Sequence, residues 1–482
     1  IFHLFFIERM LIIGNINYKE VHSMKKIDFS NPSSIYFVGI GGVSMCGLAE
    51  LLADAGFRVS GSDRAPSPLT KALEAKGITV FYGQKSENIT DDLDCVVFTS
   101  AIKPDNPEYI AAHEKEIPCL TRGQLMGQVM KQYSTPIAIS GTHGKTTTSS
   151  MASEILMAAD LDPTLSIGGI LKSINGNIRV GGSDVFLTEA CEYTNSFLNF
   201  FPKIGIILNV EEDHMDFFKD IHEIRESFHK FAKLIPADGI LLINHEIEGR
   251  EIITADLNCP VKTFGFTEEC DYFASDLEID DHGNYHFIFH TPNNETQEIM
   301  LEVVGKHNVC NALAALAMAD FLNIPLETAA RGLQAFTGTD RRFDFKGSIG
   351  GVNIIDDYAH HPTEIAATLE AAKNYPHQHL WCVFQPHTYT RTKAFLKEFA
   401  EALSKAEHVV LADIYAARET NTLGISSKDL QKEIVKLGGD CKYFPSFDEI
   451  ENFLLENCIP GDLLITMGAG DVVKIGENLL GN

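Results

Sequence analysis

The chain has 482 residues and a net charge of −27 at pH 7. At roughly 150 residues per domain, this length predicts about three domains. Hydrophobic residues make up 45% of the chain and charged residues 22%, as in globular domains that bury a core of their own. Such an acidic chain has no general attraction for nucleic acids or anionic membranes, so neither is expected as a partner. Anionic substrates would need local Lys and Arg residues.

The ten cysteines are scattered from Cys46 to Cys458, and no two form a CxxC pair. This spacing argues against a zinc site and against a thioredoxin-like motif, and scattered thiols are typical of the reducing cytoplasm. The apolar start of the chain is interrupted by Glu8 and Arg9 and is too short for a membrane span. Because Met24 followed by two lysines looks like a natural start, residues 1–23 are expected to be a non-native or disordered extension outside the fold.

Three segments share the order strand, glycine turn, helix. The first has a strand over 35–38, the glycines of 39–42 and a helix over 44–55, with further strands over 57–60 and 95–98. Strands that alternate with helices predict a parallel sheet.

The second segment has a strand over 136–140, a glycine turn and a helix with apolar residues at helical spacing, followed by strands over 185–188, 204–208 and 239–243. Residues 270–304 alternate between polar and apolar and contain turn signals, which predicts a hairpin or a small antiparallel insert.

The third segment has a strand over 352–356, a polar turn and a helix that starts near Pro362, followed by strands over 379–384, 408–411 and 462–466. We therefore expect three α/β domains, over 24–132, 133–345 and 346–482.

The strongest motif is the glycine turn of the second segment, Gly141-Thr142-His143-Gly144-Lys145-Thr146-Thr147. Glycines let backbone N–H groups approach a phosphate, Lys145 can reach the β- and γ-phosphates, and Thr146 can bind magnesium. The pattern GxxxxGK[ST] has glycine where this chain has Ile139, so the loop is a variant. The alternative is a glycine turn that only caps a helix.

The first glycine turn, with Gly41 and Gly42, has Ser44 in place of the third glycine of GxGxxG. Ser62 and Asp63 follow about 20 residues later, near the place of a ribose-binding acid. The turn predicts a site for a nucleotide diphosphate. An NAD(P)-dependent oxidoreductase and a tight turn without a ligand are the alternatives, and the former leaves Lys145 and Thr146 unexplained.

Candidate metal ligands follow two strands of the second segment. Glu189 ends one strand and His214 lies after another, and with Thr146 they could hold one or two Mg²⁺ ions against ATP. Glu192 competes with Glu189 for this role, and solvated loop carboxylates are the alternative.

Four polar clusters follow further along the chain, and caps or exposed charges are the alternative for each. They are a helix start with His307, Asn308 and Asn311; a loop with Arg341 and Arg342, whose guanidinium groups suit phosphate; and two strand-to-helix turns, one with Asp357, Tyr358 and His360, the other with His387 and Arg391.

Taken in order, GTHGKTTT, EACEYTNSF, HNVCNALAA, GTDRRF, DDYAHHPTEI and FQPHTYTRT resemble the motifs of the Mur ligase family from about residue 33 to the C-terminus. The resemblance implies a Rossmann-like UDP-substrate domain, a central phosphate-loop ATPase domain and a Rossmann-like C-terminal domain. It also implies an ATP-dependent carbon–nitrogen ligase of peptidoglycan synthesis. GIGGVSM, EACEYTNSF and DDYAHHPTEI are most similar to the motifs of members that add L-alanine to UDP-N-acetylmuramate.

The resemblance also implies residue roles. Lys145 and His214 are the expected catalytic residues, and Thr146, Glu189 and His214 would hold two Mg²⁺ ions. The UDP part would meet Gly41, Gly42, Ser44, Ser62 and Asp63, and the substrate carboxylate or amino acid would meet His360, His387 and Arg391. ATP would meet Gly141, Thr142, His143, Gly144, Lys145, Thr146, Thr147, His307, Asn308, Asn311, Arg342, Asp357 and Tyr358.

The resemblance implies a cytoplasmic enzyme, as a monomer or homodimer, with UDP-N-acetylmuramate and L-alanine as substrates. Two departures keep a peptide-recycling ligase open: Thr388 stands where several members have Arg, and Tyr193 follows Glu192 as in that relative. A nucleotide-binding protein without ligase activity is the other alternative. The amine's general base stays open between His214 and His360.

Overall fold

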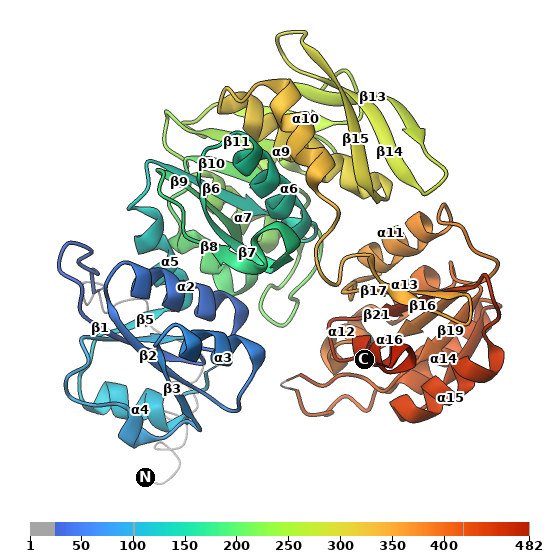
Figure 1. Ribbon diagram of the computed structural model, residues 1–482, viewed down its shortest axis with the longest axis horizontal. Coiled ribbons are helices and arrows are strands. Elements are labelled where there is room, and N and C mark those ends of the chain that lie inside the picture. The colour runs from blue at the N-terminus through green and yellow to red at the C-terminus, as the bar shows by residue number, and fades with distance from the viewer. Residues whose placement is uncertain (1–24, 100–101, 418, 482) are drawn as a thin grey trace, which may run out of the picture. The chain divides into compact units, whose positions relative to one another are not determined.

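The computed structural model describes residues 25–99, 102–417 and 419–481 (Figure 1). The chain divides into two compact units, one ending at Gln128 and the other starting at Val129, and each is described by itself. The predicted extension over 1–23 lies outside the described residues. Among the described residues, none of the helices has both the length and the apolar character needed to cross a bilayer.

The first unit contains a five-stranded, all-parallel sheet in the order β3-β2-β1-β4-β5. Strand order reverses at β1, which pairs with β2 on one side and β4 on the other, and ligands of such sheets bind at this point. The bounds are β1 Ser34–Val38, β2 Arg58–Asp63, β3 Thr79–Tyr82, β4 Cys95–Phe98, β5 Cys119–Thr121, α2 Val43–Asp54, α3 Pro68–Ala75, η1 Ser86–Asn88, α4 Pro107–Glu114 and α5 Arg122–Met130.

The second unit begins with a ten-stranded sheet in the order β15-β14-β13-β12-β11-β10-β6-β9-β7-β8. Its middle strands are parallel, and β13, β14 and β15 form the predicted antiparallel insert. The β7–β8 hairpin was not predicted. The strands are β6 Thr135–Ser140, β7 Thr164–Leu171, β8 Gly176–Arg179, β9 Val185–Ala190, β10 Ile204–Ile207, β11 Ile240–Asn244, β12 Val261–Gly265, β13 Tyr272–Ile279, β14 Asn284–His290 and β15 Thr296–Val304.

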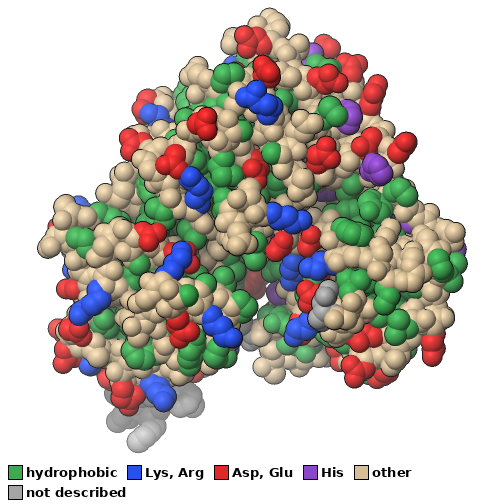
Figure 2. All heavy atoms as spheres, in the orientation of Figure 1, with side chains coloured by type: hydrophobic (Ala, Val, Ile, Leu, Met, Phe, Trp, Pro, Cys, Tyr) green, Lys and Arg blue, Asp and Glu red, His purple; other side chains and the backbone are tan. Residues whose placement is uncertain are grey.

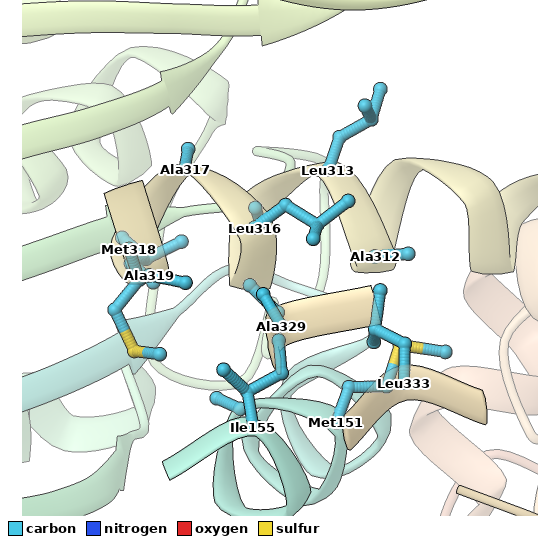
Figure 3. Packing of buried hydrophobic residues seen from close by; sticks show 14 of the residues in the cluster. Met151, Ile155, Ala312, Leu313, Leu316, Ala317, Met318, Ala319, Ala329 and Leu333 are labelled. Atoms are coloured by element: carbon cyan, nitrogen blue, oxygen red, sulfur yellow. The ribbon is translucent and has the colours of Figure 1, made fainter. Parts of the chain in front are cut away.

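Helices α6, α9 and α10 of this part pack together (Figure 3). Helix α9 is alanine-rich and buried almost all round, so its small side chains let neighbours approach. A Cβ at Gly332 of α10 would lie 2.6 Å from the Ile155 Cα of α6, so only glycine allows this approach. The helices are α6 Lys145–Ala158, η2 Lys172–Ile174, η3 Tyr193–Asn199, α7 Ile221–Ala232, α8 Arg250–Ile253, α9 Lys306–Phe321 and α10 Leu326–Ala335.

The C-terminal part of this unit is a six-stranded sheet in the order β16-β17-β21-β18-β19-β20, with a hydrophobic core on each face. Strand β18 shows the alternation: Cys382 packs in the core with α11, α13 and α14, and Val383 packs in the core with α15 and α16. The elements are β16 Asp344–Ile349, β17 Val352–Asp357, α11 Pro362–Ala372, β18 Leu380–Phe384, α12 Tyr389–Ala394, α13 Leu396–Leu403, β19 His408–Leu411, α14 Ser427–Lys436, β20 Asp440–Tyr443, α15 Phe447–Asn457, β21 Leu463–Met467 and α16 Val473–Leu480.

The three sheets confirm the predicted α/β fold class. The predicted domain boundaries stay predictions, although β16 already starts at Asp344, before the boundary placed after residue 345. On the face shown in Figure 2, acidic and basic side chains are interleaved, so the net negative charge does not gather there in one patch.

Candidate active site

The glycine turn of the second unit lies between the end of β6 and the start of α6. Gly141 and Gly144 have φ values of 143° and 81°, which side chains rarely adopt, and a Cβ at Gly144 would lie 2.7 Å from the Asn311 Oδ1. Because β6 lies between β9 and β10, the segments that follow these three parallel strands meet at one edge of the sheet. The fold therefore gathers the predicted phosphate loop and both predicted metal-binding segments.

Lys145 is folded back onto its own loop. Its Nζ donates to the carbonyl oxygens of Gly141 and Thr142, and it lies 3.1 Å from the Glu192 Oε2. Burial by itself would lower the pKa of this lysine, but nearby anionic groups, Glu192 foremost, raise it above its usual value. Lys145 is therefore a positive charge at the loop, held by neighbours for which phosphate oxygens would compete.

Thr146 and Glu189 are brought together as predicted. The Thr146 Oγ1 donates to the Glu189 Oε2 at 3.2 Å, while the Glu189 Oε1 accepts from the Ser149 Oγ at 3.0 Å and from the Gly168 N–H at 2.6 Å. Register explains the contact, because Ile139 of β6 pairs with Glu189 of β9. A hydroxyl and a carboxylate at this place are the oxygen ligands that Mg²⁺ prefers.

His214 lies beside Glu192. Its Nε2 is 3.8 Å from the Glu192 Oε1 and 3.8 Å from the Asp213 Oδ2, and its ring stacks on Tyr193 at 4.5 Å between centroids. Glu192, which was expected only as a competitor of Glu189, thus lies between the lysine and the histidine. Its buried Oε1 has no hydrogen-bond partner among the described residues, which marks it as a group that a ligand could satisfy.

A cavity of about 760 Å³ opens beside the loop, a volume in the range of small-molecule sites. Its lining includes eight of the predicted ATP residues, but Gly141, Thr142, Lys145, Thr146 and Tyr358 are not among the lining residues. The sequence did not indicate Asn244, Phe336 or Tyr375, which also line it, because none of them belongs to a recognisable motif. The predicted residues in the lining are His143, Gly144, Thr147, His307, Asn308, Asn311, Arg342 and Asp357.

The C-terminal part of the unit also contributes to the lining of this cavity. Asp357 accepts the backbone N–H groups of Phe343 and Ala359, both at 2.8 Å, and burial raises its pKa to about 6. Arg342 lies 3.9 Å from the Glu364 Oε1, and its guanidinium carbon lies 5.2 Å from the Tyr358 ring centroid. Arg342 thus adds a cation to the lining of the cavity.

The side chain of His143 points toward α11. Its Nδ1 is 3.2 Å from the Glu364 Oε1 and its Nε2 is 3.6 Å from the Glu211 Oε2. Burial by itself would lower the pKa of this imidazole, but Glu364 and Glu211 raise it to about 9. The sequence missed both carboxylates, although Glu364 lies one turn after His360 on the predicted helix.

His360, His387 and Arg391 also meet, as predicted. Arg391 donates to the Asp213 Oδ1 at 2.8 Å, and its NH1 lies 3.3 Å from the His387 Nδ1, while the rings of His360 and His387 are 5.8 Å apart. Burial lowers the pKa of His360 to about 3 and that of His387 to about 4, so both are neutral at pH 7. The sequence did not single out Asp213, whose carboxylate joins this group.

Thr388, one of the two departures from the family pattern, has a φ of 64° although it is β-branched. Such backbone strain persists only where the surroundings enforce it, and it is common at functional sites. Here it places the Thr388 hydroxyl at the start of α12, where it accepts from the Arg391 N–H at 3.4 Å.

In the first unit, the glycine turn follows β1. The Gly41 N–H donates to the Asp63 Oδ2 at 2.8 Å, and the Ser44 Oγ accepts from Arg122 at 3.3 Å. Gly42 is the N-cap residue of α2. Ser62 is fully buried and donates to the Glu108 Oε2 at 2.5 Å, so this hydroxyl is engaged inside the domain rather than at its surface.

Family models match most of the chain. The models described as "Mur ligase family, catalytic domain", "Mur ligase middle domain" and "Mur ligase, glutamate ligase domain" match residues 34–134, 139–319 and 341–470. The UDP-N-acetylmuramate–L-alanine ligase of Agathobacter rectalis is 57% identical over 95% of this chain and 100% of its own length. That of Lachnospira eligens is 56% identical over the same shares.

Two solved structures are similar over almost the whole chain. The UDP-N-acetylmuramate-alanine ligase MurC of Thermotoga maritima has a TM-score of 0.79 at 28% identity, covering 93% of this chain and 98% of that one. A murein peptide ligase of Psychrobacter arcticus has a TM-score of 0.72 at 26% identity with the same coverage.

Proposed function

The chain belongs to the Mur ligase family, and from that premise we propose that it joins L-alanine to the carboxylate of UDP-N-acetylmuramate, with conversion of ATP to ADP and phosphate, in peptidoglycan precursor synthesis. The loop after β6 supports this proposal most strongly. It places Lys145 and Thr146 at one edge of the sheet, where Thr146 contacts Glu189.

The chemistry needs an activated carboxylate, because a carboxylate anion does not react with an amine. An oxygen of the muramyl carboxylate attacks the γ-phosphorus of ATP, the bond to the β-phosphate oxygen breaks, and an acyl phosphate and ADP form. Lys145 stabilises the charge on the transferring phosphoryl group, and the N-terminus of α6 adds positive potential. The amine of L-alanine then attacks the acyl carbon, and inorganic phosphate leaves.

Mg²⁺ would neutralise phosphate charge at this place. Thr146 and Glu189 fit it, because they offer two oxygen ligands that already contact each other. A second Mg²⁺ at His214 is a proposal of its own, supported by the two carboxylates at 3.8 Å from the imidazole.

The amine of L-alanine must lose a proton before or during its attack. With a pKa of about 3, His360 is a poor base for an α-amino group of pKa about 8, since the transfer costs roughly 7 kcal/mol. We therefore assign His360, with His387 and Arg391, to holding the amino acid or the carboxylate rather than to proton removal. His214 can act as the base only where it does not hold the second Mg²⁺, because both roles use the imidazole lone pair, and burial lowers the pKa of His214 as well.

The first unit would hold the UDP part at Gly41, Gly42, Ser44 and Asp63, in the crevice where strand order reverses. In this proposal Ser62 supports the turn through its backbone carbonyl oxygen, which accepts the N–H groups of Gly39 and Ile40, while its hydroxyl is bound to Glu108 and does not touch the ligand. Because ATP and the sugar nucleotide meet in the cytoplasm, we place the reaction there.

The decisive experiment measures phosphate release from ATP and Mg²⁺ with UDP-N-acetylmuramate, with and without L-alanine, and identifies the product by mass. We expect release that requires both substrates and a sugar nucleotide that gains one alanine. Coupling of a tri- or tetrapeptide without coupling of L-alanine would instead identify a recycling ligase. ATP binding without any coupled product would contradict both.

A further inference from the structure

Three potential metal ligands gather between the phosphate loop and α11. His143 comes from the loop, Glu211 from the segment after β10, and His361 is the N-cap residue of α11. One ligand atom from each lies within 4.8 Å of the other two. The cluster therefore joins the ten-stranded sheet to the six-stranded sheet, and its residues differ from the magnesium candidates Thr146, Glu189 and His214.

His143 is prepared as a ligand by its second nitrogen. Its Nδ1 lies 3.2 Å from the Glu364 Oε1, and its Nε2 is buried without a hydrogen-bond partner among the described residues, 3.6 Å from the Glu211 Oε2. Metal-binding histidines commonly donate their other N–H to a carboxylate, which fixes the tautomer and makes the free nitrogen more basic. The Glu364–His143 pair has this arrangement, and a bound cation would replace the Nε2 proton that the two carboxylates otherwise favour on this imidazole.

His361 shows a similar arrangement with a backbone partner. Its Nε2 lies 3.1 Å from the Glu212 carbonyl oxygen, which can only accept, so the proton belongs on that nitrogen. The other nitrogen, Nδ1, is then unprotonated and has only a long contact of 3.4 Å with the Thr363 N–H. The rings of His143 and His361 lie 4.6 Å apart. Thr363 also orients Glu211, since its hydroxyl donates to the Glu211 Oε2 at 2.6 Å.

We propose that His143, Glu211 and His361 form a site for a divalent transition-metal ion of the Zn²⁺ or Co²⁺ type, which clips the phosphate loop to the start of α11. Two imidazole nitrogens and one carboxylate are a ligand set of zinc sites with an open position, and Mg²⁺ prefers oxygen ligands alone. Cysteine spacing argued against a zinc site, but this one uses no cysteine. The proposal is independent of the ligase function, because it concerns binding of the ion itself.

The test uses the full chain with its affinity tag removed, freed of metal and titrated with Co²⁺ at neutral pH, with visible absorption as the readout. We expect one Co²⁺ per chain with the bands of a four- or five-coordinate nitrogen–oxygen site, without thiolate charge transfer, and displacement by Zn²⁺. His361→Ala removes a ligand and abolishes the spectrum. Glu364→Gln keeps every ligand and weakens affinity by about 10–100-fold.

Two further variants make the outcome decisive. Glu211→Ala also removes a ligand but lies in a loop, so it stays informative if His361→Ala, which alters a helix cap, fails to fold. His214→Ala disturbs only the neighbouring magnesium candidate and leaves Co²⁺ binding unchanged. The proposal is overturned if the wild type shows no Co²⁺ spectrum, as when His143 is only a protonated partner of two carboxylates. It is equally overturned if the spectrum survives Glu211→Ala or is lost with His214→Ala.

Discussion

The two glycine turns of the chain, residues 39–44 and 141–146, begin alike and differ in their side chains. Each follows a buried parallel strand and opens a helix, so each can present backbone N–H groups to an anion. In the first turn, the side chain that contacts the backbone is a carboxylate, because the Gly41 N–H donates to Asp63. In the second it is the cation of Lys145, with Thr146 and Glu189 beside it. The backbone thus predicts anion binding, and the side chains decide whether phosphoryl transfer can follow.

The largest expected effect comes from removing the cation that only the second turn carries. Lys145→Ala should lower kcat by about 10³-fold, because it removes charge stabilisation of the transferring phosphoryl group. Affinity for UDP-N-acetylmuramate, measured by calorimetry, should stay unchanged, since the first turn is untouched. The exposed Lys230→Ala on α7 is the matched control and should behave as wild type. Substantial turnover by Lys145→Ala would contradict a role for this cation in phosphoryl transfer at the second turn.

A pair of glycine variants should separate the two ligands. Gly144→Ala forces a side chain into a φ of 81° and against Asn311, a strain of about 1–3 kcal/mol that should weaken ATP binding by about 10–100-fold. Gly41→Ala places a Cβ 2.8 Å from the Asp63 Oδ2 and should weaken only the sugar nucleotide. The Kd of ATP and the Kd of UDP-N-acetylmuramate, measured for each variant, check the prediction. A loss of ATP affinity in Gly41→Ala would contradict the assignment of one ligand to each turn.

Glu192 has no counterpart in the first turn, because it connects Lys145 to His214. Glu192→Gln keeps the shape of the side chain but removes the charge, so Lys145 should lose its fixed position. We expect kcat to fall by about 10–100-fold, as displaced catalytic groups do, with little change in the Kd of ATP. Steady-state kinetics measures kcat, and calorimetry measures the Kd of ATP. Unchanged kcat would show that Glu192 only neutralises the lysine.

The smallest expected effect is a pH dependence of the free energy of unfolding, and it comes from a histidine of the second unit. Burial lowers the pKa of His387 in the second unit from 6.5 to about 4. Below about pH 6.5 the folded state therefore binds fewer protons than the unfolded state. The free energy of unfolding is highest above this pH and decreases as the pH falls toward 4. After allowance for solvent screening, we expect the free energy of unfolding to be about 1 kcal/mol lower at pH 5 than at pH 7.

Chemical unfolding at pH 7 and pH 5 measures this loss, and His387→Gln should reduce it. A similar loss in the variant would assign the pH dependence to other groups, such as His360.

The sequence predicted the strands that carry motifs because their apolar runs end in glycine or in charged residues. The helix start at Pro362 and the antiparallel insert were also predicted. The β7–β8 hairpin was missed, since its first strand, TLSIGGIL, neither alternates nor ends in a turn signal. Its position follows from pairing with β9, which is information from elsewhere in the chain.

The same limit applies to the site. Lys145, Thr146 and Glu189 could be predicted because strand ends place them at one edge of the sheet. The partners across the two sheets of the second unit could not be predicted, since Asp213 meets Arg391 and His143 meets Glu364 only after both sheets have folded. Ser62 shows the converse: it stands where a ligand contact was expected, but a distant buried acid, Glu108, engages its hydroxyl.

In the proposed reaction, a phosphoryl group passes at the second turn from ATP to the carboxylate of the sugar nucleotide. UDP-N-acetylmuramate labelled with ¹⁸O in both carboxylate oxygens, supplied with unlabelled ATP and L-alanine, reports on this transfer. We expect each inorganic phosphate released to carry one ¹⁸O, because the acyl phosphate breaks at its carbon–oxygen bond. Phosphate without label, released together with the alanine product, would contradict it.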